Sequence, residues 1–188
     1  MSNLLEEFMG SMGSQVTGQL SSNLGIDSKT ANAILPQVLP MILGGLKKQK
    51  DERGGAERVD HILNKYGSSS VLDDIGGLFS TKAQDPKPDP ALGGLLGDAG
   101  IQATNLFGKQ FNLDSGTAAK IIPMLAPVIL GFLTKKRDTG TGSSGIASLL
   151  DQDGDGSVLD DVAGFLMSGL AGSSSQKKGG LLSGLLGG

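Results

Sequence analysis

The chain has 188 residues, enough for one ordinary domain or two small ones, and 38% of them are apolar. It contains no Trp and one Tyr but 31 Gly, so aliphatic side chains must build the core, which is typical of helix packed on helix. A net charge of −3 does not suit a protein that neutralises nucleic-acid phosphates, and the absence of Cys excludes disulfides, thiolate nucleophiles and cysteine zinc sites.

The amino-terminal segment predicts an amphipathic helix. Its apolar residues recur at three- and four-residue spacing, which places them on one helix face. They are Leu5, Phe8, Met9, Met12, Val16 and Leu20. Because Glu6 and Glu7 stand where a signal peptide would be apolar, and no basic stretch precedes them, we expect no secretory signal.

The next segment, 28–48, is apolar and contains prolines. Asp27 or Ser28 is expected to cap a helix there. Since Pro36 removes a backbone donor and restricts the residue before it, we expect a short helix, a break and a second helix. The lysines that follow fall where cations favour a helix end, and we interpret them as a solvated end rather than a nucleic-acid surface. The longest apolar run, 33–46, is too short to span a bilayer, so we expect a soluble, cytoplasmic protein.

A further helix is predicted at AERVDHILNKYG, with its single histidine, His61, on the surface rather than acting as a catalytic base. The segment 81–90, TKAQDPKPDP, is rich in proline and charge and predicts a stiff linker.

The second half of the sequence repeats the first at a constant offset. TAAKIIPMLAPVILGFLTKK matches TANAILPQVLPMILGGLKK, and matched positions differ by 87 residues (123 − 36 for the first prolines). The matched pairs are Pro36 and Pro123, Pro40 and Pro127, Gly44 and Gly131, Asp27-Ser28 and Asp114-Ser115, and SVLDD at 70–74 and 157–161. Leu95, Leu96, Ala99, Ala103 and Phe107 keep the amino-terminal stripe. We call two residues counterparts when they lie 87 positions apart, one in each repeat.

We therefore predict an all-α fold of two tandem copies of a small multi-helix unit, its helices short and interrupted by Pro and Gly. The predicted divisions are a first repeat at 1–80, the linker at 81–90, a second repeat at 91–172, and a flexible Gly-rich tail at 173–188.

An acidic loop lies in the second repeat. Asp151, Asp153 and Asp155 stand at positions 1, 3 and 5 of a calcium loop, Gly156 allows the turn, and the main-chain carbonyl of Ser157 takes position 7. Both flanking segments look helical. Calcium is therefore the predicted ion, and a solvated acidic turn is the alternative.

The loop departs from the calcium pattern at position 12, where Val162 replaces a bidentate Glu. Asp160 either closes a shortened loop as a ligand or caps the next helix in the pattern S-x-x-D. The first repeat has the same pattern, Ser70 and Asp73, without the three loop aspartates, so capping alone is enough to explain Asp160, and the ligand and cap roles stay equally open. Without the Glu, we expect weak affinity, near ~10⁻⁴ M.

Two segments, LGIDSKTANAILPQVLPMILGGL and FNLDSGTAAKIIPMLAPVILGFL, together with DQDGDGSVLDD, resemble the bacterial YidB-like proteins of unknown function. The resemblance covers most of 1–80 and 91–172. It implies a small, all-helical, non-enzymatic protein and carries over no catalytic residue.

The sequence favours a structural or interaction protein that binds a protein partner or itself, with no nucleic acid and no small-molecule substrate identified. The alternative is peripheral membrane association through the amino-terminal helix and the Leu/Gly-rich tail, although Glu6 and Glu7 do not suit anionic lipids. An enzyme is disfavoured because no nucleophile, base and oxyanion set is recognisable, and no catalytic residue is predicted.

Overall fold

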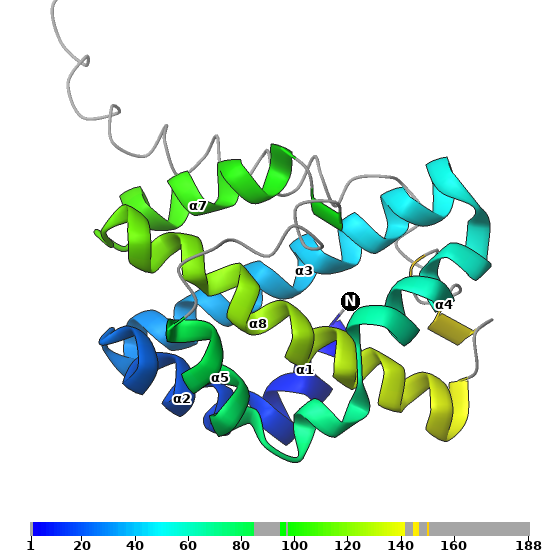
Figure 1. Ribbon diagram of the computed structural model, residues 1–188, viewed down its shortest axis with the longest axis horizontal. Helices are drawn as coiled ribbons and strands as arrows, with labels where there is room; N and C mark the ends of the chain where they lie inside the picture. Colours follow the sequence, from blue (N-terminus) through cyan, green and yellow to red (C-terminus); the bar gives the residue numbers. More distant parts are fainter. Residues whose placement is uncertain (1, 85–94, 97, 142–144, 147–149, 151–188) are drawn as a thin grey trace, which may run out of the picture.

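The computed structural model describes residues 2–84, 95–96, 98–141, 145–146 and 150. Throughout this part of the chain the backbone is helical apart from short connecting turns, and no strand occurs in it (Figure 1). The predicted all-α class is confirmed.

The amino-terminal helix forms as its apolar spacing predicts. α1 (Ser2–Phe8) continues through a π-helical segment (Met9–Gly13) into α2 (Ser14–Leu24). Phe8, Val16 and Leu20 are fully buried, so the predicted stripe faces the core. α2 ends at Gly25, whose φ of 66° lies in the left-handed region that glycine adopts without strain.

Two long helices, α3 (Ser28–Arg53) and α8 (Ser115–Lys136), cross the middle of the molecule (Figure 1). The predicted break at the prolines is wrong, because Pro36 and Pro40 lie inside α3 as their counterparts lie inside α8. Two prolines four residues apart share one helix face, and the donor that the second lacks would have bonded to the carbonyl of the first. The disruption therefore stays on one side of each helix.

The other faces of these helices carry the residues that hold them in place. Each fully buried aliphatic side chain contributes about 1.5–3 kcal/mol, and several of them outweigh the roughly 3 kcal/mol that an interior proline costs. The fully buried residues of α3 include Ile34, Leu35, Val38 and Ile42, and those of α8 include Ile121, Leu125, Val128 and Ile129.

Shorter helices complete the fold. They are α4 (Gly55–Tyr66), a 3-10 turn (Ser69–Leu72), α5 (Ile75–Gln84), α7 (Asp98–Gln110) and a π-helical end (Arg137–Thr141). α4 confirms the predicted third helix. α5 extends four residues into the segment predicted as a linker, whereas the remainder of that linker and the predicted tail at 173–188 lie outside the described residues.

α8 lies at the centre, with α7 on one side and α2 and α5 on the other (Figure 1). α4 and the turn after it pack on its carboxyl-terminal half, where two glycines permit a close backbone approach. A Cβ on Gly131 would lie 2.8 Å from the carbonyl oxygen of Ser68, and one on Gly67 would lie 2.7 Å from that of Leu130. A single hydrophobic core thus joins residues from both predicted repeats.

Candidate functional site

The two long helices begin at aspartates, as predicted. Asp27 accepts hydrogen bonds from the backbone N–H of Thr30 at 2.9 Å and from its hydroxyl at 2.6 Å. Asp114 accepts from the N–H groups of Gly116 at 2.9 Å and Thr117 at 3.0 Å. Hydrogen bonds from the threonine side chain and backbone lower the pKa of each aspartate. These exposed caps fix where the helices start, so their role is structural.

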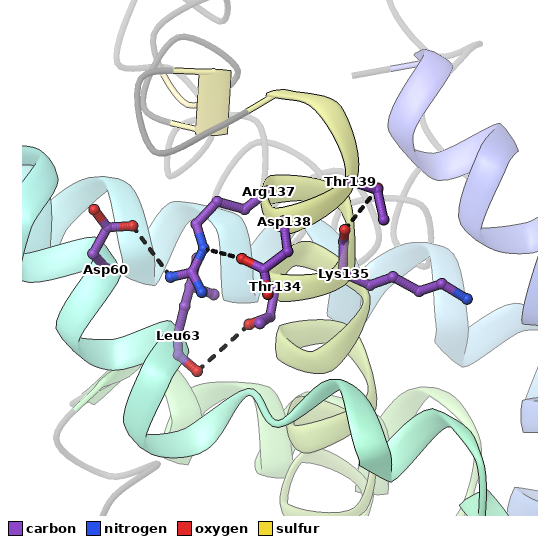
Figure 2. Close-up of polar contacts among 7 residues, drawn as sticks. All are labelled: Asp60, Leu63, Thr134, Lys135, Arg137, Asp138 and Thr139. Atoms are coloured by element: carbon purple, nitrogen blue, oxygen red, sulfur yellow. Dashed lines mark hydrogen bonds and ion pairs between the residues drawn. The ribbon is translucent and has the colours of Figure 1, made fainter.

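A polar cluster holds the carboxyl-terminal end of α8 against α4 (Figure 2). The Arg137 guanidinium donates to Asp138 at 2.8 Å and to Asp60 of α4 at 3.3 Å, and these carboxylates raise its pKa. Beside it, the buried Thr134 hydroxyl donates to the carbonyl of Leu63 at 3.5 Å. The cluster therefore ties together two helices, one from each predicted repeat.

Lys136, the residue directly before Arg137, pairs with Glu7 of α1. The partners are 129 residues apart, and Arg137 and Asp60 are 77 apart, so no local sequence signal predicts either pair. Lys136 and Arg137 therefore lie at the end of α8, as predicted, and they pair with carboxylates of other helices instead of being only solvated.

A pocket of about 340 Å³ lies where α1 and the following π-helical segment meet the end of α8. Phe132 and Met12 form its apolar part, and Ser11, Lys135 and the Glu7–Lys136 pair border it. The edge of the Phe8 ring packs on Phe132, with ring centroids 5.3 Å apart. The pocket offers no nucleophile beside a base, so its lining does not define a reaction.

The segment of the first half that carries the S-x-x-D pattern folds differently from the prediction. α5 begins after Asp74, whose carboxylate accepts the N–H of Gly77 at 2.8 Å. The capping role predicted for Ser70 and Asp73 is wrong, because Asp73 lies at the end of the 3-10 turn and is exposed. His61 is exposed on α4, in agreement with its predicted surface position.

The predicted calcium ligands, Asp151, Asp153, Asp155, Ser157 and Asp160, lie outside the described residues. Within 2–84, 98–141 and the few described positions around them, no group of three or more His, Cys, Asp or Glu is placed to hold a metal ion. The calcium site therefore stays a prediction from the sequence.

One helix within the described residues, Ser115–Gly140, is long and apolar enough to cross a membrane by composition, and 67% of its most apolar window is buried inside the fold. Its apolar side chains are those of α8 in the core, which accounts for its composition without a membrane.

The fold and its polar contacts define an all-helical protein whose charged side chains link helices to one another. The chain belongs to a family of bacterial proteins of unknown function (DUF937), whose model matches residues 6–137. No curated protein matches the sequence, and no solved structure does.

Proposed function

We propose that the protein is a non-enzymatic structural or protein-interaction module of the bacterial cytoplasm, made of two tandem copies of one helical unit. The observation that carries the duplicated unit in this proposal is that counterpart residues adopt the same unusual backbone geometry. Gly25 and its counterpart Asn112 are both left-handed, with φ of 66° and 51°, and each comes two residues before a capping aspartate. Few non-glycine residues adopt a positive φ, so this agreement supports a duplicated unit.

Burial follows the same offset beyond α8. Val59 and Leu63 of α4 are 2% and 0% exposed, and their counterparts Ile146 and Leu150 are 1% and 4% exposed. We also propose that the chain is YidB-like, which is a narrower assignment than the family. Both copies carry the aspartate cap and the proline-containing apolar segment of that resemblance, and the second copy also carries DQDGDG.

A structural role is supported by how the ionisable groups are used. Arg137 and Lys136 hold helices together, and the described aspartates at helix starts cap them. Ile101 of α7 is 65% accessible, and we take it as the position at which to test contact with a protein partner or a second copy of the chain.

Light scattering on the full chain, compared with Ile101→Ser, tests self-association. A wild-type dimer that Ile101→Ser converts to a monomer would support it. A pull-down from the native bacterium with the two proteins as matched baits tests a different protein partner. If the wild type is monomeric and both baits capture the same background, the interaction proposal fails.

We also propose one weak calcium loop formed by Asp151, Asp153, Asp155, the carbonyl of Ser157 and Asp160. The first copy supports Asp160 as a ligand rather than a cap, because its counterpart Asp73 does not cap α5. The capping residue there is Asp74, whose counterpart is Asp161. Capping therefore falls to Asp161, which leaves Asp160 for the ion.

Thermal melts with calcium and with chelator test this assignment. With an affinity near ~10⁻⁴ M, calcium at about 100 times that value stabilises the fold by about 2.7 kcal/mol, or roughly 5–10 °C. Asp153→Ala and Asp160→Asn should abolish the shift. Asp161→Ala is the matched control: it removes the proposed cap, so it should lower the melting temperature in both conditions and keep the shift. Identical wild-type melts in calcium and chelator would refute the loop.

The membrane alternative has less support, because the apolar stripe on which it relied is used in the core: Phe8, Val16 and Leu20 are fully buried. Co-sedimentation of the full chain with anionic vesicles, with and without calcium, would revive this alternative.

A further inference from the structure

The pocket between the amino-terminal helix and the end of α8 is lined by both π-helical segments that the structure describes. Ser11 and Met12 belong to the first segment, Met9–Gly13, and Thr139 and Gly140 belong to the second, Arg137–Thr141. Single π-helical turns that continue an α-helix occur frequently at functional sites. Two such turns, far apart in the sequence, therefore meet at one pocket.

Each π-helical segment carries a hydroxyl group whose hydrogen is already used. The Ser11 hydroxyl donates to the carbonyl of Glu7 at 2.7 Å, and the Thr139 hydroxyl donates to the carbonyl of Lys135 at 2.7 Å (Figure 2). Because a hydroxyl has one hydrogen to donate, neither group can donate to a ligand while these bonds are kept. An anion in the pocket therefore needs another donor.

Lys135 is that donor. Its side chain is exposed and extends away from the Arg137 cluster in Figure 2, and no carboxylate of the described residues forms an ion pair with it. The other charged groups of the lining, Glu7 and Lys136, neutralise each other. The pocket is thus left with one uncompensated positive charge, which suits a ligand with one negative charge.

The apolar part of the lining has a fixed position. Phe132 is 7% exposed, and the Phe8 ring packs against it with ring centroids 5.3 Å apart, so the core holds this ring in place. Met12 adds a thioether, and both groups make favourable contacts with aromatic rings. The volume of about 340 Å³ lies near the lower end of the range for ligand pockets, so it suits a group about the size of one ring.

We propose that this pocket binds a small organic acid with one carboxylate and one aromatic or branched apolar group. Lys135 donates to the carboxylate, and the apolar group lies against Phe132 and Met12. This binding role goes beyond the structural role proposed above and does not depend on the duplication. The sequence alone does not indicate the pocket, because its residues come from 7–12 and 132–140, which only the fold brings together.

NMR titration of the isotopically labelled full chain with hydrocinnamate, a carboxylate joined to one ring by two methylenes, tests the proposal. We expect shifts of backbone amide signals that saturate and are concentrated at residues 7–12 and 132–140. Hydrocinnamamide lacks the charge and propionate lacks the ring. Each should bind at least about tenfold more weakly, because a hydrogen bond to a charged group and the burial of a ring each contribute that much or more.

Substitutions of Lys135 test the assigned donor. Lys135→Met should weaken hydrocinnamate binding about tenfold, whereas Lys135→Arg should retain it. Lys48→Met is the matched control, because Lys48 is the exposed counterpart on α3 and does not line this pocket, so binding should not change.

Unchanged binding by Lys135→Met overturns the proposal, and so does equal binding of hydrocinnamamide. Shifts spread evenly over the chain would also overturn it. Tighter binding of an acetylated tetrapeptide that ends in phenylalanine would replace the small acid by the end of a protein chain as the ligand.

Discussion

The close approach of α8 to the turn before α5 makes Gly131→Ala a sharp test of the packing. The new methyl carbon would lie 2.8 Å from the Ser68 carbonyl oxygen, and this neighbour is backbone, which cannot rotate away. Overpacking of this kind costs about 1–3 kcal/mol. Replacing Gly by Ala inside a helix otherwise gains about 1 kcal/mol. We expect a net loss of up to about 2 kcal/mol in the free energy of unfolding.

Gly18→Ala is the matched control. Gly18 lies inside α2, is exposed, and a Cβ there would meet no atom within 4 Å. Only the helix-propensity gain applies, so this variant should be more stable by up to about 1 kcal/mol. Urea unfolding of the full chain, followed by far-ultraviolet circular dichroism, measures both. If Gly131→Ala is stabilised as much as Gly18→Ala, then α8 does not approach the turn as described.

Two further predictions concern charged groups. The pKa of Asp27 and Asp114 lies below the ordinary value of 3.8, so the stability that these caps supply is present above that value and is lost as the pH falls through their lower folded-state pKa. Acid titration of unfolding should show this loss, and Asp114→Asn should reduce its pH dependence. Separately, Lys47 pairs with Asp51 of the same helix at 3.0 Å. Because a partly exposed pair four residues apart on a helix contributes about 0.3–0.5 kcal/mol, Lys47→Met should lower the free energy of unfolding by no more than that, as measured by urea unfolding.

Local signals in the sequence predicted the features that depend on neighbouring residues. The apolar spacing from Leu5 to Leu20 gave the right buried face, and Asp27 and Asp114 cap the helices that follow them. Both features depend on interactions within one or two helical turns, where residue type and spacing determine the outcome.

The errors come from features that tertiary packing decides. Pro36 and Pro40 are tolerated because their helix is held on its other faces by the core, which local propensity does not report. The pair between Arg137 and Asp60 joins helices that only the fold brings together. The S-x-x-D pattern of Ser70 and Asp73 is typical of a helix start, but a 3-10 turn occupies that segment, and α5 begins after Asp74, which caps it.

The residues of the first repeat that match the acidic loop indicate separate roles for the residues of that loop. Val162 stands where a calcium loop keeps its last carboxylate, and its counterpart Ile75 is fully buried, so on the proposed duplication this position belongs to the core. Gly154 is the counterpart of Gly67, which permits close contact with α8. Asp161 is the counterpart of Asp74, which caps α5.

On the proposed duplication, these scaffold roles account for Val162, Gly154 and Asp161. The remaining acids are Asp151, Asp153, Asp155 and Asp160. The positions 87 residues before the first three hold Asn64, Tyr66 and Ser68, so the turn in the first half of the chain forms without acidic side chains. Clustered carboxylates repel one another unless a cation compensates them, and calcium is the cation we propose. The melts in calcium and chelator test this compensation: a wild-type melting temperature that the chelator leaves unchanged would mean that the acids need no bound calcium.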